Sequence, residues 1–238
     1  MKITNVRTVR LTRPLDKPQR NAQGGRDHRP FNFVLVETDA GFTGLGEAFG
    51  DDALMEHIVA KRIGPMAVGL DPNDNDALWS RLFASRAFWE IGGSVLCAIS
   101  AVEVACWDIR GQAEGVPVYE LLGGKTRDRI EAYASDLHWE DPAQMAEKAA
   151  GYVADGYRFV KTHVGAPGED ERDLERIAAV RDAIGENTGF MIDINTAFKR
   201  PRAHAFGQAI AEFNPFWYEE PLSPLDFAGH RELRDALP

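Results

Sequence analysis

The stretch YRFVKTHVGAPGEDERDLERIAAVRDAIGENTGFMIDIN, residues 157–195, decides the fold. It opens with a short apolar run that ends at His163, continues with a charged segment of helical periodicity over 169–184, and closes with a second apolar run that reaches Asp193. A strand, a helix and a second strand in this order are typical of a parallel βαβ unit.

The same unit recurs along the second half of the chain. His163 and Asp193 are 30 positions apart, and Asp193 and Glu219 are 26 apart, each about one strand, helix and strand. Parallel strands with right-handed crossovers would bring these three strand ends side by side. The pattern predicts strands at 129–135, 157–163, 189–194 and 216–219, with helices at 141–156, 169–184, 201–213 and 226–236. Four such strands are half of a (β/α)₈ barrel, so we expect a truncated barrel or one completed by something outside this chain.

The first half of the chain has a different pattern. Alternating apolar and polar residues predict strands at 3–13, 31–37 and 42–47, and helical periodicity predicts helices at 53–67, 73–88 and 94–114. The segment 16–30 is long, polar and rich in Gly and Pro, which indicates a mobile loop that could serve as a lid. Strands followed by helices favour an α+β layer.

Composition restricts the possible partners. The chain has 238 residues and 44% hydrophobic residues, enough for a substantial core, with 37 acidic against 27 basic residues and a net charge of −10. This balance argues against a nucleic-acid or anionic-membrane surface. Because no signal peptide or membrane span is evident, we expect a cytoplasmic protein. Cys97 and Cys106 are interpreted as buried thiols.

Two acids at strand ends are candidate metal ligands. Asp193 lies among apolar neighbours, so its carboxylate should be buried and require a compensating charge. Mg²⁺ supplies such a charge and prefers oxygen ligands. Glu219 ends the next strand, and only one of Glu219 and Glu220 can face the barrel centre. A helix cap or turn is the alternative for a single acid, but two acids one module apart favour a metal site.

Lys161 and His163 are candidate catalytic residues. They are two positions apart, so in a strand their side chains share a face. His163 suits a general base, because its ordinary pKa lies near neutrality, and Lys161 would hold an anionic carboxylate or stabilise developing negative charge. The alternative interpretation is a surface lysine beside a histidine with a structural hydrogen bond.

Other polar residues are weaker candidates. Asn195 follows Asp193 by two positions on the same face and could contact substrate. His28, in the expected lid, is a further candidate for substrate contact. The remaining histidines have no ligand spacing and are interpreted as surface or core residues: His57, His138, His204 and His230.

Taken together, these motifs resemble the enolase superfamily, and more closely its mandelate racemase and muconate lactonizing enzyme branch. SAVEVACWDIRGQAEGVPVYELLGG at 100–124 is similar to the helix and turn that lead into that family's barrel, and GLGEAF at 44–49 is similar to its capping-domain hairpin. VKTHVG, MIDIN and WYEEPL resemble the ends of the second, third and fourth barrel strands.

The resemblance implies an α+β capping domain over 1–124, which contributes a specificity lid, and an incomplete (β/α) barrel over 125–238 that binds Mg²⁺. It implies that Asp193 and Glu219 are the first two metal ligands and that Asn195 is a polar neighbour of the first. It also implies a homo-oligomer. In much of that branch, the position of His163 holds a lysine. The third acidic ligand and the opposite-face acid or base of the family would follow residue 238.

The functional hypothesis follows from the residues and the resemblance. The complete protein is expected to remove the α-proton of a small hydroxy-carboxylate through an enediolate and then to lose a β-hydroxyl as water, as in dehydration of a sugar acid. One alternative is a racemase, epimerase or cycloisomerase of the same superfamily. Another is an inactive fragment or a split half that needs the missing half of the barrel.

Overall fold

The computed structural model describes residues 1–84 and 92–238 of the chain. Contacts between Cα atoms divide them into two compact units. The first comprises 1–14 and 28–128, and the second comprises 15–27 and 129–238. The predicted fold class, an α+β capping domain followed by an incomplete (β/α) barrel, is confirmed by the two sheets described below.

A three-stranded sheet carries the first unit. Its strands are β1 (Ile3–Asn21), β2 (Gly24–Thr38) and β3 (Thr43–Glu47), in the order β1-β2-β3. β2 and β3 pair in antiparallel register from Phe33 opposite Glu47 to Glu37 opposite Thr43. Alternate residues of β2, Val34 and Val36, are fully buried, which is the period-2 pattern of a sheet with one face on the core.

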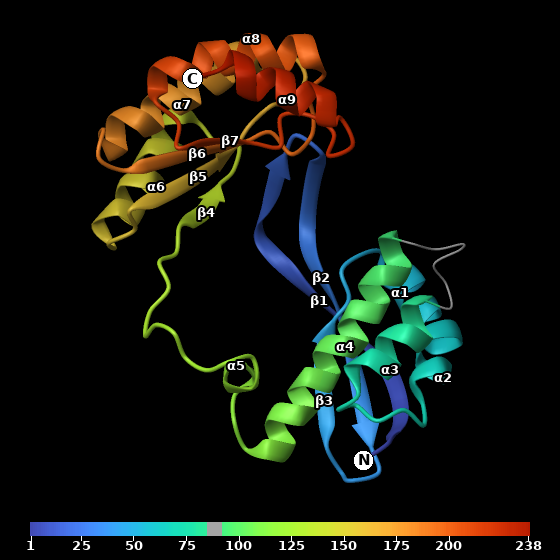
Figure 1. Ribbon diagram of the computed structural model, residues 1–238. Coiled ribbons are helices and arrows are strands. Elements are labelled where there is room, and N and C mark those ends of the chain that lie inside the picture. Colours follow the sequence, from blue (N-terminus) through green and yellow to red (C-terminus); the bar gives the residue numbers. More distant parts are fainter. Residues whose placement is uncertain (85–91) are drawn as a thin grey trace. The chain divides into compact units, whose positions relative to one another are not determined.

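The prediction of a mobile loop at 16–30 is wrong. Both strands continue through this segment, and only Ala22 and Gln23 form the turn between them (Figure 1). The Asn21 side chain accepts a hydrogen bond from the backbone N–H of Gln23 at 3.0 Å, an Asx-type contact that tightens the turn. A two-stranded ladder satisfies the backbone whatever the side chains are, so polar composition did not reveal the strands. Residues 15–27 belong to the second unit, and we call them the hairpin tip.

Helices cover the first sheet. A continuous helical segment comprises α1 (Asp52–Ile58), a π-helical turn (Val59–Ile63) and α2 (Gly64–Ala67). α3 (Asn75–Trp79) continues into a second π-helical turn (Ser80–Ala84), and the end of the helix expected at 73–88 lies outside the described residues. α4 (Gly93–Glu114) and the short α5 (Val118–Leu121) complete the unit. Cys106 is buried and Cys97 half-buried, and burial raises the pKa of the Cys106 thiol to about 12.

The glycines of β3 allow α4 to lie directly on the strand. A Cβ atom at Gly44 would stand 2.0 Å from the carbonyl oxygen of Ala105, and one at Gly46 would stand 1.9 Å from that of Ala101. Real Cβ atoms do not come so close to a backbone oxygen, so any side chain at these positions would push the helix away. The GLG motif therefore reflects close packing between a strand and a helix.

A parallel sheet carries the second unit. Its strands β4 (Ala134–Leu137), β5 (Phe159–His163), β6 (Gly189–Asp193) and β7 (Trp217–Glu219) follow one another in sequence order. The strand expected at 129–135 begins only at Ala134, and the preceding residues are irregular, with Ile130 exposed. The interior of β5 and β6 is buried on both faces, as expected for parallel strands covered by helices.

Four helices connect and follow these strands. They are α6 (Pro142–Ala154), α7 (Asp170–Ile184), α8 (Arg200–Ile210), which ends in a 3₁₀ turn (Ala211–Phe213), and α9 (Phe227–Ala236). Neighbouring helices pack against each other in sequence order, and α7, α8 and α9 lie along one side of the sheet (Figure 1). This is the alternation that the module spacing predicts.

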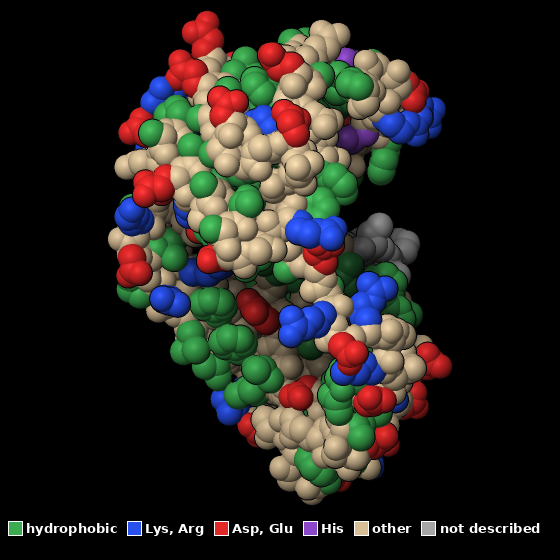
Figure 2. All heavy atoms as spheres, turned by 90° about the vertical axis from the view of Figure 1, so that its left-hand side faces the viewer, with side chains coloured by type: hydrophobic (Ala, Val, Ile, Leu, Met, Phe, Trp, Pro, Cys, Tyr) green, Lys and Arg blue, Asp and Glu red, His purple; other side chains and the backbone are tan. Residues whose placement is uncertain are grey.

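The surface is mixed in charge. On the face drawn in Figure 2, Lys and Arg side chains are scattered among Asp and Glu side chains, in keeping with the net charge of −10. Among the described residues, no helix combines the length and the hydrophobicity needed to cross a membrane.

Candidate active site

Strand register brings the chemically active residues together. In the parallel pairing of β5 with β6, His163 lies opposite Asp193, and in that of β6 with β7, Asp193 lies opposite Glu219. All three are the last residues of their strands. Because the three strands end in register at the same edge of the sheet, an imidazole and two carboxylates lie in a row.

Lys161 joins the two carboxylates. Its ammonium Nζ lies 2.8 Å from both Oε1 and Oε2 of Glu219 and 3.3 Å from Oδ2 of Asp193. The side chain is only 7% exposed. Burial by itself lowers the pKa of Lys161, but the hydrogen bonds to Glu219 and the charge of Asp193 outweigh burial, so the pKa lies above its usual value. Lys161 is thus a fixed cation shared by two acids.

Asp193 is held as a carboxylate by three partners. Its Oδ2 lies 3.3 Å from Lys161 Nζ and 3.2 Å from Nδ1 of His163, and its Oδ1 accepts the backbone N–H of Asn195 at 2.8 Å. Burial of the side chain, which is 4% exposed, raises its pKa, but these hydrogen bonds and charges reverse the effect and hold the pKa below its ordinary value. The expected compensation for a buried acid is supplied by lysine and histidine.

The orientation of His163 suits a general base. Nδ1 lies 3.2 Å from Oδ2 of Asp193, a close contact without hydrogen-bond geometry, and Nε2 is the ring nitrogen left to meet a substrate. The ring stacks on His138, with centroids 4.9 Å apart and planes 8° from parallel. His138 directly follows β4, which ends at Leu137.

The structure places His138, interpreted from the sequence as a surface or core residue, against the ring of His163. Its sequence position held a usable signal, because it precedes His163 by 25 positions, again about one module. Metal-binding histidines within one segment recur at short spacing, and residues at neighbouring strand ends do not show such spacing. Only the fold reveals that the two rings stack.

Two aromatic residues also support the cluster. The Trp217 indole N–H donates to Oε2 of Glu219 at 2.9 Å, and the Tyr133 ring lies edge-on to Trp217 at 5.6 Å. Lys161 Nζ lies 5.6 Å from the centre of the Tyr133 ring, within cation–π range. Trp217 is two residues before Glu219 and so shares its face of the strand, a relation visible in the sequence.

The backbone immediately after β6 and β7 is unusual. Asn195, Thr196 and Glu220 have φ values of 50°, 63° and 43°, in the left-handed region that residues other than glycine rarely adopt. The Gln23 side chain, at the hairpin tip, donates to the backbone oxygen of Asn195 and to Oγ1 of Thr196, the latter at 2.8 Å. The turn after β6 is therefore held by the hairpin tip.

The remaining candidates lie apart from this cluster or do not use their side chains in it. Asn195 contributes its backbone N–H to Asp193, while its buried Oδ1 has no partner among the described residues. His28 is exposed on β2 in the first unit. Substrate contact by either residue remains a prediction.

Comparison with known families agrees with this geometry. Residues 3–123 match the family model described as mandelate racemase/muconate lactonizing enzyme, N-terminal domain, and residues 144–238 match the model described as enolase C-terminal domain-like. The chain belongs to the mandelate racemase and muconate lactonizing enzyme family. The resemblance seen in the sequence is confirmed.

Relatives in this family include enzymes that act on sugar acids and their lactones. The chain is 33% identical to D-galactarolactone cycloisomerase of Agrobacterium fabrum, with 100% of the chain matching 63% of that protein. It is 32% identical to D-xylonate dehydratase of Haloferax volcanii, with 82% matching 51%. The chain thus spans about half to two thirds of the length of these relatives.

Solved structures of the family have the same fold. An enolase superfamily member from Polaromonas sp. JS666 is 33% identical, with a TM-score of 0.91 over 100% of this chain and 64% of that one. A dipeptide epimerase from Cytophaga hutchinsonii, solved with Mg and a dipeptide, is 26% identical, with a TM-score of 0.84 over 100% of this chain and 64% of that one.

The side chains at the strand ends include the type of ligand that a magnesium ion requires. Asp193 and Glu219 present carboxylate oxygens to one shared cation, the Lys161 ammonium, and carboxylates are the ligands that Mg²⁺ prefers. Within residues 1–84 and 92–238, no three His, Cys, Asp or Glu side chains form a group that could hold a metal. Mg²⁺ is commonly held by one or two carboxylates with water and substrate, so two acids match the protein part of its usual ligand set.

Removal of the Lys161 charge should destabilise the second unit. In a Lys161→Met variant, two acids face each other without their cation, and removal of one partner from a buried ion pair costs about 3–5 kcal/mol. We expect the free energy of unfolding, measured with urea in metal-free buffer, to fall by that order.

Lys125→Met provides the control, because Lys125 forms an exposed pair with Asp128 and such pairs contribute about 0–1 kcal/mol. Adding Glu219→Gln to Lys161→Met should recover part of the loss, since one of the two carboxylates left without their cation is then neutralised. Equal stability of Lys161→Met and wild type would show that Lys161 does not balance these acids.

Proposed function

We propose that the complete protein removes the α-proton of a hydroxy-carboxylate and then expels a β-hydroxyl as water, making it a sugar-acid dehydratase. The observation that carries this proposal is the row of His163, Asp193 and Glu219 around the Lys161 ammonium. The names of the relatives, which are sugar-acid dehydratases and a cycloisomerase, support the reaction class.

The difficulty of this reaction is the low acidity of the proton on the α-carbon. A proton α to a carboxylate is weakly acidic, and its removal leaves an enediolate with two negatively charged oxygens. Positive charge that is already in place can stabilise this intermediate without reorganisation of solvent. Lys161 supplies such a charge, because its ammonium is buried and oriented by Glu219 and Asp193.

His163 is proposed as the base. Asp193 faces Nδ1 and sets the ring orientation, which leaves Nε2 to accept the proton from carbon. The imidazolium that forms would be stabilised by the same carboxylate. Water would leave after protonation of the departing hydroxyl, and His163 or an acid on the opposite face could supply that proton.

Mg²⁺ is proposed as the cofactor, with Asp193 and Glu219 as two of its ligands. When bound, the ion would supply Lewis-acid stabilisation of the carboxylate oxygens of the substrate. The dipeptide epimerase structure that contains Mg supports this assignment. Trp217 would orient Glu219 through the hydrogen bond to its Oε2.

A racemase, epimerase or cycloisomerase is the second candidate. The galactarolactone cycloisomerase among the relatives favours it, and each of these reactions begins with the same proton removal. The outcome would be decided by acid or base groups on the other face of the substrate. Assembly of the complete protein into a homo-oligomer is proposed from the family resemblance alone.

The base assignment can be tested by isotope exchange. In the full-length protein, His163→Ala should reduce exchange of the substrate α-proton with deuterated solvent by roughly 100-fold or more, the typical contribution of a general base. Proton NMR of the sugar acid would follow the exchange. His57→Ala is the control, because His57 is exposed in the last turn of α1. Unchanged exchange in His163→Ala would remove His163 from the base role.

The metal assignment can be tested by binding alone. Asp193→Asn removes one ligand charge and should weaken Mg²⁺ binding about 10-fold or more, measured by calorimetry or by competition with Mn²⁺ in electron paramagnetic resonance. Asp182→Asn is the matched control, since Asp182 is exposed on α7. Equal Mg²⁺ affinity of Asp193→Asn and wild type would exclude Asp193 as a ligand.

The 238-residue chain by itself is proposed to have little activity. It spans 63% and 51% of the two relatives, and large apolar residues near the β7 edge are exposed, including Phe216, Leu225 and Phe227. We expect no turnover of sugar acids by this chain in the presence of Mg²⁺. Chelator-sensitive turnover by the isolated chain would contradict this expectation and the alternative of an inactive fragment.

A further inference from the structure

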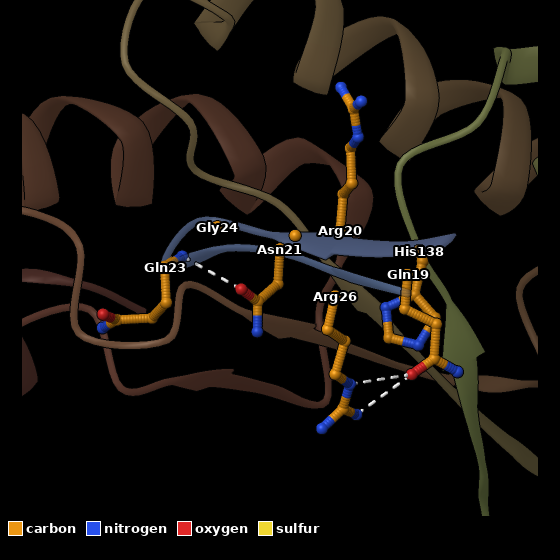
Figure 3. Close-up of a pocket in the computed structure, with 8 residues that line it drawn as sticks. Gln19, Arg20, Asn21, Gln23, Gly24, Arg26 and His138 are labelled. Atoms are coloured by element: carbon orange, nitrogen blue, oxygen red, sulfur yellow. Dashed lines mark hydrogen bonds between the residues drawn. The ribbon is translucent and has the colours of Figure 1, made fainter. Parts of the chain in front are cut away.

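A cavity of about 260 Å³ lies within the second unit beside the proposed base. Residues 19–21 and 23–26 of the hairpin tip line it, together with His138 at the end of β4 (Figure 3). Its volume is slightly below the range of about 300–1,000 Å³ that is usual for drug-sized ligands. It could therefore receive one end of a small metabolite.

His138 connects this cavity to His163. The His138 ring lines the cavity and stacks on the His163 ring at 4.9 Å. A molecule whose reacting carbon lies at His163 could therefore extend past His138 into the cavity.

His138 also has polar atoms with weak or missing partners. Its Nδ1 is buried and has no hydrogen-bond partner among the described residues, and its Nε2 lies 3.6 Å from Oδ1 of Asp136. Asp136 is already paired, through Oδ2, with Lys148 at 2.8 Å and Tyr152 at 2.9 Å. Burial, and then the nearby His163, lower the pKa of His138 below its ordinary value.

Arg26 places a positive charge in the same cavity. Its Nε and Nη2 both donate to Oε1 of Gln19, at 3.2 and 3.0 Å, so a neutral amide holds the guanidinium in place. Among the described residues, Arg26 forms no ion pair with a carboxylate. Figure 3 shows Arg26 and Gln19 beside His138, whereas Arg20 extends from the opposite side of the hairpin. An arginine oriented in this way is suited to a carboxylate, which it can bind through two parallel hydrogen bonds.

We propose that Arg26, Gln19 and His138 form a subsite for the second carboxylate of a dicarboxylic sugar acid. The inference rests on the proposed function, which places the first carboxylate and the α-carbon near Lys161 and His163. Arg26 binds the distal carboxylate, Gln19 orients the guanidinium, and His138 forms a polar wall between the two ends. The protein then prefers aldaric acids, which have two carboxylates, over aldonic acids, which have one.

The subsite is tested by equilibrium binding to the full-length protein. Two matched pairs of probes differ only in the distal group: galactarate against galactonate, and glucarate against gluconate. By calorimetry with Mg²⁺ present, we expect wild type to bind the dicarboxylate of at least one pair roughly 10-fold more tightly, the lower end of the contribution of a hydrogen bond between charged groups. Arg26→Gln should abolish this preference and leave binding of the monocarboxylate within about 3-fold.

Two further variants separate recognition from a structural role. Lys17→Gln removes a charge from the same hairpin and should preserve the preference, because Lys17 is exposed and is not among the residues that line the cavity. Arg26→Lys should restore part of the preference, since it keeps the charge but loses the forked geometry. Equal weakening of both acids of a pair by Arg26→Gln would show that Arg26 only supports the hairpin and would overturn the proposal.

The result also separates this proposal from the proposed function. Absence of preference for the dicarboxylate in both pairs overturns the subsite, even if α-proton exchange occurs. A preference that depends on Arg26, without α-proton exchange for either acid, supports the subsite and contradicts the proposed reaction.

Discussion

The ammonium of Lys161, held between the carboxylates of Asp193 and Glu219, is the interaction on which the proposed site depends. Two acids at neighbouring strand ends would repel each other, and the buried Asp193 would be costly to keep ionised without a partner. The shared cation helps to hold the pKa of Asp193 below its ordinary value. It also fixes their orientation, so that the acids that could hold a metal and the charge that could stabilise an enediolate belong to the same cluster.

The sheet and the turns that follow it keep this cluster in place. Parallel register sets His163, Asp193 and Glu219 side by side, and the left-handed residues Asn195 and Glu220 bend the chain immediately after two of these strands. Such conformations cost free energy unless their surroundings hold them. Gln23 of the hairpin tip binds the first of these turns, so the segment expected to be a mobile lid is tied to the edge of the proposed site.

Much of the architecture could be predicted because it depends on local periodicity. The spacing of 30 and 26 residues between His163, Asp193 and Glu219 predicted consecutive parallel strands, and the structure has them in that order. The hairpin tip was missed because its pairing uses backbone groups, which polar side chains do not reveal. His138 and Trp217 were missed because stacking on His163 and donation to Glu219 are contacts between different strands or depend on side-chain rotamers.

The sequence by itself determined the order of modules, the identity of the acids and bases at the strand ends, and the family, because each is written in residue type and spacing along the chain. Tertiary structure alone decided that Lys161 is shared by both acids, that His138 stacks on His163, and that Arg26 and Gln19 meet His138 at one cavity. These relations join residues far apart in the chain. Their distances are set by strand register, side-chain rotamers and the docking of the hairpin tip, and none of these leaves a periodic signal in the sequence.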